Sequence, residues 1–394
     1  MSESIKLAVV ASHPIQYWAS AYRRLEQLKG VELMVFYAAE NGAREYFDCE
    51  FNQYVKWDVP LTEGYSYHFL RPGHIIDRFS FWSVDAPVIK DRLEEFAPDY
   101  ILVNGYGQLL SWRAMRFAKR AGARLIYISD SNFLQEQRGW KQTIKKYVLG
   151  YFFARVDFFL VTSPRNQQYL NFYGADSDKF LLAPLPTDIE WFAEQVLKVD
   201  EDDLDQLRHR HRIDKQQHVL LYVGKLISHK RPDDLVDALA QIKTRNVVTI
   251  IVGNGPLLKG LRKKVMQMGL ESKVRFTGFV NQSSLAKYFV LGDIFVFPSE
   301  REPYGLIASE VLSAGLPIVA ADNIGAVGAA IQPEVNALLY PSGDTNSLAG
   351  CIDQLLTNPQ LLQDLSAGSK AISCDNGVSR LVEVVKGIIN RKEI

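Results

Sequence analysis

The sequence predicts an α/β protein with two doubly wound domains, each a parallel sheet covered by helices on both faces. Short apolar runs rich in β-branched residues alternate with helix-length amphipathic segments along most of the 394 residues. Such near-continuous apolar runs are typical of parallel strands that are buried on both faces. The alternation occurs as two series, and each series is long enough for one domain.

The first series contains five predicted strands, with helical patterns between most of them. Residues 40–70 interrupt the series, because they are rich in aromatic residues and lack helix signals. We expect them to form an insertion or a small hairpin on the first domain. The predicted strands are 5–12, 31–39, 100–105, 124–129 and 158–163, and the predicted helices lie near 85–96, 108–121 and 140–154.

The second series begins after a readable boundary. The stretch APLPTDIEWF (183–192) carries two prolines that break regular structure. The charged stretch 198–213 is typical of a surface helix. We therefore predict a first domain over 1–190, a hinge near 186–200 and a second domain over 200–374. The second domain's predicted strands are 218–224, 247–253, 274–278, 294–299 and 317–322.

Composition excludes several classes of protein. Lys+Arg and Asp+Glu residues number 45 each, whereas a general nucleic-acid-binding protein carries a basic excess. Cys49, Cys351 and Cys374 show no CxxC spacing, which favours free thiols over a disulfide or a zinc site. The N-terminal apolar segment is too short for a membrane span and lacks the basic start of a signal peptide. We expect a cytoplasmic protein, with a peripheral contact at the inner face of the membrane left open.

The stretch SEREPYGLIASEVLSAGLPIVA (299–320) holds the first candidate site, because open α/β sheets bind ligands beyond the carboxyl ends of their strands. A carboxylate in the loop can accept hydrogen bonds from two sugar hydroxyls, and a helix start favours phosphate. Two acids around a helix start match a sugar nucleotide, although either acid alone is better explained as a solvated surface group. The candidate residues are Glu302, Tyr304, Gly305, Leu306, Ile307 and Glu310.

Three further strand ends in the second domain supply candidates. The loop after 218–224 carries several cations, which suit a diphosphate. Glycine-containing turns follow the strands at 247–253 and 274–278, where another group can approach the backbone and an aromatic face is available to a flat base. A solvated basic loop and ordinary turns are the alternative interpretations. The candidates are Gly224, Lys225, Lys230, Gly255, Phe279 and Val280.

The first domain offers polar residues at matching strand ends. His13 follows the first strand directly, and Asn104, Tyr106 and Asp130 follow the strands at 100–105 and 124–129. We expect these four residues on the acceptor side of a ligand site, with an ordinary loop histidine as the alternative for His13.

Several motifs do not occur in the sequence. It contains no GxGxxG opening a strand-to-helix turn, no GxxxxGK[ST] and no GxSxG. A nicotinamide cofactor and a P-loop ATPase are therefore not expected, and we expect neither a cofactor nor a metal.

The second domain resembles the retaining glycosyltransferases of family 4, which have the GT-B fold of two facing Rossmann-like domains with a cleft between them. The resemblance rests on the E-x7-E segment, the loop of Lys225 and Lys230, and the stretches VGNGP, VRFTGFV and ALLYPSGDTNSLAGCIDQLL (337–356). It covers about 215–374, whereas the first domain resembles the family more loosely. The family also commonly returns its last helix to the first domain, as 376–392 could do.

This resemblance implies metal-independent transfer of a sugar with retention at the anomeric carbon. By position, Glu302 would contact sugar hydroxyls, Glu310 the ribose, and Lys225 and Lys230 the diphosphate. With His13 after the first strand, Glu302, Lys225 and Lys230 are the predicted catalytic residues. The chain departs from the family where Asn104 replaces a common histidine and where NIGAVGAA (323–330) replaces a Gly-Gly…Glu loop.

The hypothesis from sequence is a glycosyltransferase that uses a nucleoside diphosphate sugar, UDP-linked, and a hydroxyl-bearing glycan, lipid-linked or small-molecule acceptor. Two alternatives remain: a non-catalytic nucleotide-sugar-binding subunit of a larger transferase, and a sugar-nucleotide epimerase of the same fold. The aromatic and basic helix near 140–154 is either packed in the core or in contact with anionic lipid.

Overall fold

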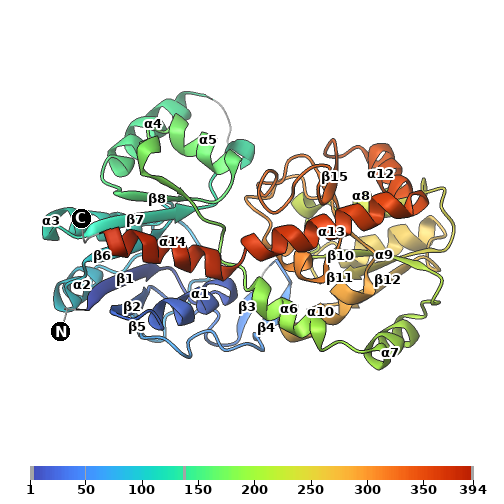
Figure 1. The fold of residues 1–394 in the computed structure, drawn as a ribbon, viewed down its shortest axis with the longest axis horizontal. Coiled ribbons are helices and arrows are strands. Elements are labelled where there is room, and N and C mark those ends of the chain that lie inside the picture. The colour runs from blue at the N-terminus through green and yellow to red at the C-terminus, as the bar shows by residue number, and fades with distance from the viewer. Residues whose placement is uncertain (1–3, 49, 136–138, 392–394) are drawn as a thin grey trace. The chain divides into compact units, whose positions relative to one another are not determined.

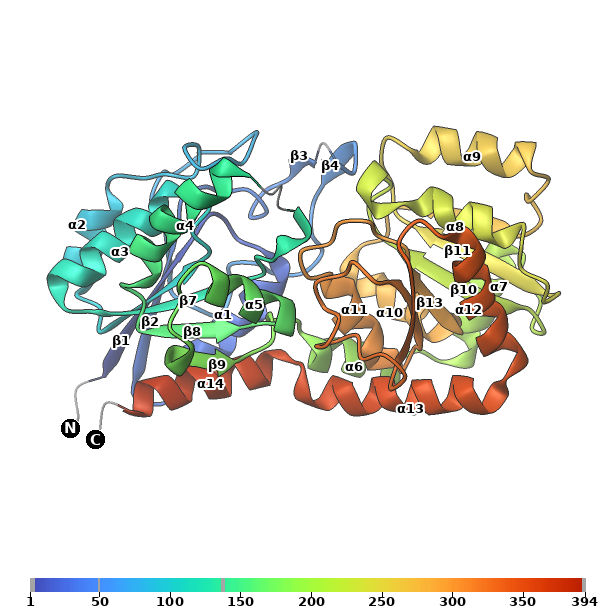
Figure 2. The same ribbon diagram turned by 90° about the horizontal axis from the view of Figure 1, so that it is seen from above.

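The structure is a computed structural model that describes residues 4–48, 50–135 and 139–391. Of the three cysteines, Cys49 lies outside the described residues, and Cys351 and Cys374 are free thiols. The chain forms two compact units, shown in Figures 1 and 2. The first unit comprises Met1–Tyr46, Val59–Thr187 and Val378–Ile394, and the second comprises Phe47–Asp58 and Asp188–Gly377.

The first unit is built on one parallel sheet. Among the described residues it has seven strands in the order β5-β2-β1-β6-β7-β8-β9. The order places β1 beside β6 and makes that pair the point where the winding reverses. The strands are β1 (Ile5–Ala11), β2 (Val31–Tyr37), β5 (Tyr67–Phe69), β6 (Tyr100–Asn104), β7 (Arg124–Ser129), β8 (Phe158–Val161) and β9 (Phe180–Leu182).

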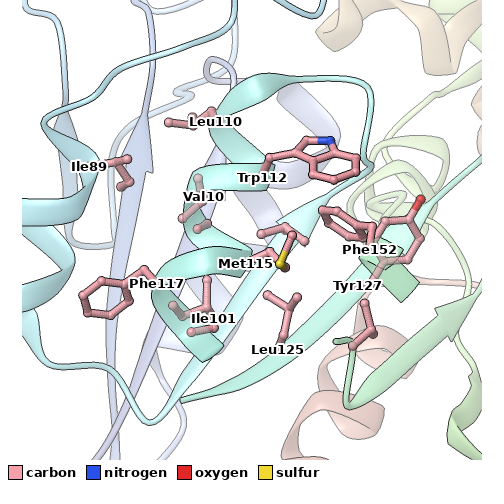
Figure 3. Close-up of a cluster of buried hydrophobic side chains, with 14 of the residues drawn as sticks. Val10, Ile89, Ile101, Leu110, Trp112, Met115, Phe117, Leu125, Tyr127 and Phe152 are labelled. Atoms are coloured by element: carbon pink, nitrogen blue, oxygen red, sulfur yellow. The ribbon is translucent and has the colours of Figure 1, made fainter. Parts of the chain in front are cut away.

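Helices cover both faces of this sheet, with α2 and α3 on one side and α14 on the other (Figure 2). Helix α3 contributes Leu110, Met115 and Trp112 to the same buried cluster as the sheet residues Val10 and Ile101 (Figure 3). The Trp112 ring lies beside that of Phe152, with centroids 4.9 Å apart. The helices are α1 (Gln16–Glu26), α2 (Ile89–Phe96), α3 (Leu109–Ala121), α4 (Trp140–Phe153), α5 (Pro164–Phe172) and α14 (Val378–Asn390), with 3-10 turns η1 (Phe133–Gln135) and η2 (Ser177–Lys179).

The last helix belongs to the first unit. Helix α14 packs on α1, and its apolar side, including Leu381, Val385 and Ile388, is buried. The Tyr100 hydroxyl lies 3.5 Å from the Ile388 carbonyl oxygen, and the Arg24 guanidinium donates to the Ser379 hydroxyl. The end of the chain therefore completes the core that its beginning starts.

The second unit repeats the same plan. In the part of the chain that the structure describes, its main sheet has six strands in the order β12-β11-β10-β13-β14-β15, all parallel. A two-stranded sheet pairs β3 with β4. The strands are β3 (Tyr46–Asp48), β4 (Gln53–Val55), β10 (His218–Val223), β11 (Val247–Val252), β12 (Val274–Gly278), β13 (Ile294–Phe297), β14 (Ile318–Ala321) and β15 (Ala337–Tyr340).

Several helices of the second unit begin at a residue whose side chain caps them. Asp200 caps α7 through its side chain, and Gly315, with a positive φ of 72°, ends the 3-10 turn that follows α11. The helices are α6 (Ile189–Leu197), α7 (Glu201–His211), α8 (Pro232–Leu239), α9 (Leu258–Gln267), α10 (Gln282–Leu291), α11 (Leu306–Val311), α12 (Thr345–Thr357) and α13 (Pro359–Asp375), with 3-10 turns η3 (Ser228–Lys230) and η4 (Leu312–Ala314).

One part of the organisation differs from the expectation. Residues 40–70 were expected to stay with the first domain, but Phe47–Asp58, here named the 47–58 segment, groups with the second unit. The reason is local: its acids and aromatic rings pair with second-unit side chains, as described below. Elsewhere, the passages between units fall at Thr187/Asp188 and Gly377/Val378.

Candidate functional site

The second unit has a topological switch point between β10 and β13. These strands are neighbours in the sheet, yet the chain leaves β10 toward β11 and leaves β13 toward β14. In doubly wound sheets such a reversal opens a crevice at the carboxyl ends, where ligands bind. Lys225 and Lys230 follow β10, and Glu302 follows β13. The structure thus brings these three predicted residues to one place in the sheet.

Lys230 and Glu302 form an ion pair across the switch point. Both side chains are largely buried, with exposed fractions of 19% for Lys230 and 11% for Glu302. The Lys230 ammonium also lies 5.8 Å from the centre of the Phe297 ring. The two loops are joined a second time by their backbones, because the Glu300 amide donates to the His229 carbonyl at 2.8 Å. The Phe297 ring and the backbone hydrogen bond between the two loops therefore hold this ion pair in place.

Close packing and backbone hydrogen bonds fix the conformation of the loop that carries Glu302. A Cβ on Gly305, which has a φ of 94°, would lie 2.7 Å from the Phe297 ring, so only glycine fits. The Gly325 amide donates to the Glu302 carbonyl, and the Ala326 amide donates to the Tyr304 carbonyl, each at 3.0 Å. The segment NIGAVGAA (323–330) thus holds the Glu302 loop in place through two backbone hydrogen bonds.

The other residues of this loop play different parts. Tyr304 is buried, and burial raises the pKa of its hydroxyl to about 12, so this hydroxyl is neutral at physiological pH. Leu306 and Ile307 open α11 and are half-buried. The first amides of a helix lack intrahelical acceptors and could in principle bind a phosphate. However, α11 has only six residues and continues as a 3-10 turn, so its start alone is not evidence of a phosphate site.

Glu310 lies on α11 without an ionic partner among the described residues. Its side chain is only partly exposed, and burial raises the pKa of its carboxyl to about 7. This is not the solvated surface acid that formed the alternative interpretation of the sequence. A carboxyl of this kind titrates near neutrality and is ready to receive donors that compensate its charge.

Lys225 is held by the 47–58 segment. Its ammonium lies 2.6 Å from the Glu50 carboxylate and 3.2 Å from the Asp48 carboxylate. The Phe51 ring centre is 4.8 Å from the same nitrogen. Burial alone would lower the pKa of Lys225, but the two carboxylates outweigh it and raise the pKa. Sequence reasoning missed Asp48 and Glu50, because nothing in the sequence links them to a lysine that lies 177 and 175 residues further along the chain.

The same segment covers Phe279. The Phe51 ring packs edge-on against Phe279 with centroids 5.0 Å apart, and Trp57 adds a second contact at 6.2 Å. Phe279 and the adjoining Val280 are half-buried. Further along, the Asn281 amide group donates to the Lys56 carbonyl at 2.9 Å. The Phe279 ring predicted to contact a base therefore already contacts two other rings in this structure.

The glycines of the VGNGP turn have a structural explanation. A Cβ on Gly253 would lie 1.9 Å from the Gly224 carbonyl oxygen, and one on Gly255 would lie 2.6 Å from that of Leu226. The Gly224 amide also donates to the Val252 carbonyl at 3.0 Å. The close approach predicted at Gly255 is thus made by the loop that carries Lys225, and the two turns fix one another.

The first unit has a cavity of about 460 Å³ at the carboxyl ends of its own switch-point strands. Three predicted acceptor-side residues, Asn104, Tyr106 and Asp130, line it together with Tyr17 and Gln108. Burial raises the pKa of the Tyr17 hydroxyl well above its ordinary value, and the nearby Asp130 carboxylate adds to this effect. The cavity therefore offers a carboxylate, an amide and neutral hydroxyls to a polar ligand.

His13 stands beside this cavity and is not one of its lining residues. Its ring packs against Phe79, which does line the cavity, with centroids 4.7 Å apart. Nδ1 of His13 lies 2.9 Å from the Ser12 hydroxyl. Burial lowers the pKa of His13 to about 4, so the imidazole is neutral at physiological pH. It can exchange hydrogen bonds with a ligand but brings no charge.

Two properties of the described residues bear on metal binding and membrane crossing. They contain no group of three or more His, Cys, Asp or Glu side chains placed to hold a metal ion. None of the helices that the structure describes combines the length and the apolar character needed to cross a bilayer.

Comparison with a family of known proteins points to the second unit. Residues 203–371 match the family described as glycosyl transferases group 1. The match covers the switch point, both lysines and the Glu302 loop.

Individual relatives extend this result. The D-inositol 3-phosphate glycosyltransferase of Thermomonospora curvata is 28% identical over 243 residues, which is 57% of this chain and 56% of that protein. The alpha-D-kanosaminyltransferase of Streptomyces kanamyceticus is 28% identical over 163 residues, or 41% and 42% of the two chains. The chain spans about half the length of the curated relatives it matches.

Solved structures resemble the whole chain. The Anabaena protein Alr3699/HepE in complex with UDP superposes with a TM-score of 0.73 at 17% identity, covering 98% of this chain and 100% of that one. The sucrose-phosphate synthase of Thermosynechococcus elongatus gives a TM-score of 0.72 at 19% identity, covering 98% of each chain. At these identities the likeness shows the fold alone: two Rossmann-like α/β units of the GT-B type.

Proposed function

We propose that this protein is a retaining glycosyltransferase of family 4 that moves a sugar from a UDP-linked donor to a hydroxyl acceptor. The ion pair of Lys230 and Glu302 at the switch point is the observation that carries the proposal. A cation and a carboxylate held side by side suit the junction of a diphosphate and a sugar, which present anionic oxygens and hydroxyl groups in succession.

In the proposed reaction, the bond between the anomeric carbon and the diphosphate oxygen breaks, and the acceptor oxygen bonds to that carbon on the same face. The leaving diphosphate takes up the proton of the acceptor hydroxyl, so no nucleophilic side chain is required. Lys225 and Lys230 stabilise the charge that develops on the diphosphate. Glu302 holds the sugar through its hydroxyls, and no metal is needed because the lysines supply the positive charge.

The surroundings of the remaining predicted residues suggest a role for each of them. Phe279 offers its ring to the base once Phe51 and Trp57 move aside, and Glu310 accepts hydrogen bonds from the ribose. The first-unit cavity, with Asp130 and Asn104, is the proposed acceptor site. Its polar lining suits a hydroxyl-bearing glycan, lipid-linked or small-molecule acceptor.

Binding of the donor is tested first by thermal unfolding in the presence of UDP-, GDP-, ADP- and dTDP-sugars. A ligand at 100 times its dissociation constant adds about 2.7 kcal/mol to the free energy of unfolding. We expect UDP-sugars to raise the unfolding temperature most. No shift with any of the four classes would refute the proposal, and release of UDP only when an acceptor is present would support transfer.

The pH dependence of donor binding tests the role of Glu310. Burial raises its pKa to about 7. Since only the ionised carboxylate accepts two hydroxyl donors, donor affinity should rise about tenfold from pH 6 to pH 8. A UDP-sugar is the right probe, because the terminal phosphate of free UDP itself titrates near pH 6. Isothermal titration calorimetry should show that Glu310→Gln flattens this profile.

Glu310 should also make the stability of the protein depend on pH. This contribution to stability falls as the pH rises, whereas donor affinity increases. Its folded pKa lies above the ordinary value, so its contribution is fully present below pH 4.5 and is lost as the pH rises through 7. Above pH 7, the free energy of unfolding of Glu310→Gln should therefore exceed that of the unsubstituted protein by about 1–3 kcal/mol. Denaturant titration measures this difference as a higher midpoint concentration. Equal stability at pH 8 would show that the carboxyl is solvated after all.

A further inference from the structure

Helix α4 of the first unit exposes an apolar stripe to solvent. The stripe residues are three or four positions apart, so they share one face of the helix. The exposed fraction is 71% for Trp140 and 78% for Tyr147. On the other face, Leu149, Phe152 and Phe153 are buried in the core. The α4 stripe consists of Trp140, Ile144, Tyr147, Val148 and Tyr151.

A helix that is apolar all round is explained only if both faces are covered. The inner face of α4 is covered by the first unit's core. Its outer face is not packed against the described part of the chain, since all five stripe residues are exposed there. Large aromatic side chains facing water in a continuous row mark an interaction surface rather than scattered exposed residues.

The charge around the stripe identifies the partner. Residues 139–173 contain five basic residues, Lys141, Lys145, Lys146, Arg155 and Arg165, and one acid, Asp157, a net charge of +4 in a chain whose total is zero. Asp157 is exposed too, and its carboxylate accepts the Leu125 amide at 2.7 Å, so the value of +4 already includes its charge. Helix α4 itself contains no acidic residue.

Four of these five cations lie over aromatic rings, among them Lys141, whose ammonium is 6.0 Å from the ring centre of Trp140 in the stripe. The Arg155 guanidinium is 3.5 Å from the Tyr151 ring centre, and the Lys146 ammonium is 4.8 Å from that of Phe172 on α5. Tryptophan, tyrosine and flanking lysine or arginine form the combination that anchors proteins in the headgroup region of a membrane. In that region rings enter the acyl boundary while cations contact phosphates.

We propose that the α4 stripe and its flanking cations bind the surface of an anionic lipid bilayer, with α4 lying in the plane of the membrane. The proposal goes beyond the donor chemistry of the second unit and does not depend on it. The ammonium of Lys145 on α4 lies 5.4 Å from the ring centre of Tyr106, which lines the proposed acceptor cavity. A bilayer bound at α4 is therefore next to the proposed acceptor site.

Vesicle flotation with the full chain tests this surface. At about 0.1 M salt we expect the protein to float with vesicles of equal parts phosphatidylglycerol and phosphatidylcholine, and to remain in solution with phosphatidylcholine alone. Trp140→Ser combined with Tyr147→Ser should reduce binding about tenfold. Lys141→Ser combined with Lys146→Ser should reduce it about fivefold per lysine, and binding by the unsubstituted protein should weaken as salt rises.

The matched control is Trp82→Ser combined with Leu197→Ser, which removes side chains that are 75% and 86% exposed outside the stripe. This control should float like the unsubstituted protein. The proposal is overturned if the unsubstituted protein ignores anionic vesicles, or if the stripe variant binds them equally well. It is also overturned if the stripe substitutions abolish a dimer that forms without lipid, which would make α4 a protein interface. Thermal unfolding checks that every variant is folded.

Discussion

Replacing either Lys230 or Glu302 by alanine is expected to reduce sugar transfer about 10²–10³-fold while the chain remains folded. Lys230→Ala removes a charge proposed to stabilise the leaving diphosphate, and groups that stabilise developing charge in a buried site contribute effects of this size. Glu302→Ala removes the carboxylate proposed to hold the sugar. Steady-state release of UDP in the presence of acceptor, with donor binding measured separately, gives the loss in each step.

Both substitutions also break a largely buried ion pair. Removing one partner leaves the other charge without compensation, so each single variant should lose about 1–3 kcal/mol of unfolding free energy. The conservative variants Lys230→Arg and Glu302→Gln separate the two effects. Arginine keeps the charge, and Lys230→Arg should therefore retain more activity than Lys230→Ala at similar stability. Glu302→Gln keeps the shape but should still lose transfer.

Lys264→Ala is the matched control. Lys264 forms an ion pair with Asp237 at 2.7 Å, with side chains 28% and 39% exposed, and it lies on α9 in the same unit. Its removal should change activity less than twofold. Near-normal transfer by Lys230→Ala or Glu302→Ala would show that the switch-point pair is structural, and the proposed catalytic site would then be wrong.

Strands with long apolar runs were predictable from sequence, and short edge strands were not. The prediction for β7 (Arg124–Ser129) matches the structure to the residue, and those for β6 (Tyr100–Asn104) and β10 (His218–Val223) differ from it only at the last residue. By contrast, β5, β9 and β15 were not predicted. Each has only three or four residues and lies at the edge of its sheet, where it pairs with a single neighbouring strand. A pattern of that length carries too little periodic signal.

The candidate site shows the same division. Lys230 and Glu302 could be placed together because both follow adjacent strands, and strand ends meet at one edge of a sheet. Burial could not be predicted, so Glu310 was left open between a ribose ligand and a solvated acid. The pairing of Lys225 with Glu50 was beyond sequence reasoning, because it depends on a loop from another part of the chain reaching this strand end.

That pairing leads to the second large effect, which is a gain of binding. The Lys225 ammonium donates hydrogen bonds to Asp48 and Glu50, so these donors are not available to a diphosphate while the two acids accept from them. Their carboxylates also place negative charge where the proposed ligand brings more. The combined variant Asp48→Asn with Glu50→Gln should therefore bind a UDP-sugar about 10–100-fold more tightly. The lower end is expected if solvent screens Glu50, which is 56% exposed.

Calorimetric titration with a UDP-sugar measures this gain, and Asp205→Asn with Asp237→Asn is the control. Those acids pair with Lys215 and Lys264 in the same unit. The control therefore removes equal charge without freeing Lys225. If affinity rises only in the Asp48/Glu50 variant, the 47–58 segment competes with the donor, and Phe51 and Trp57 must leave Phe279 when the base binds. If affinity falls instead, the two acids belong to the binding site, and Lys225 holds the segment rather than the diphosphate.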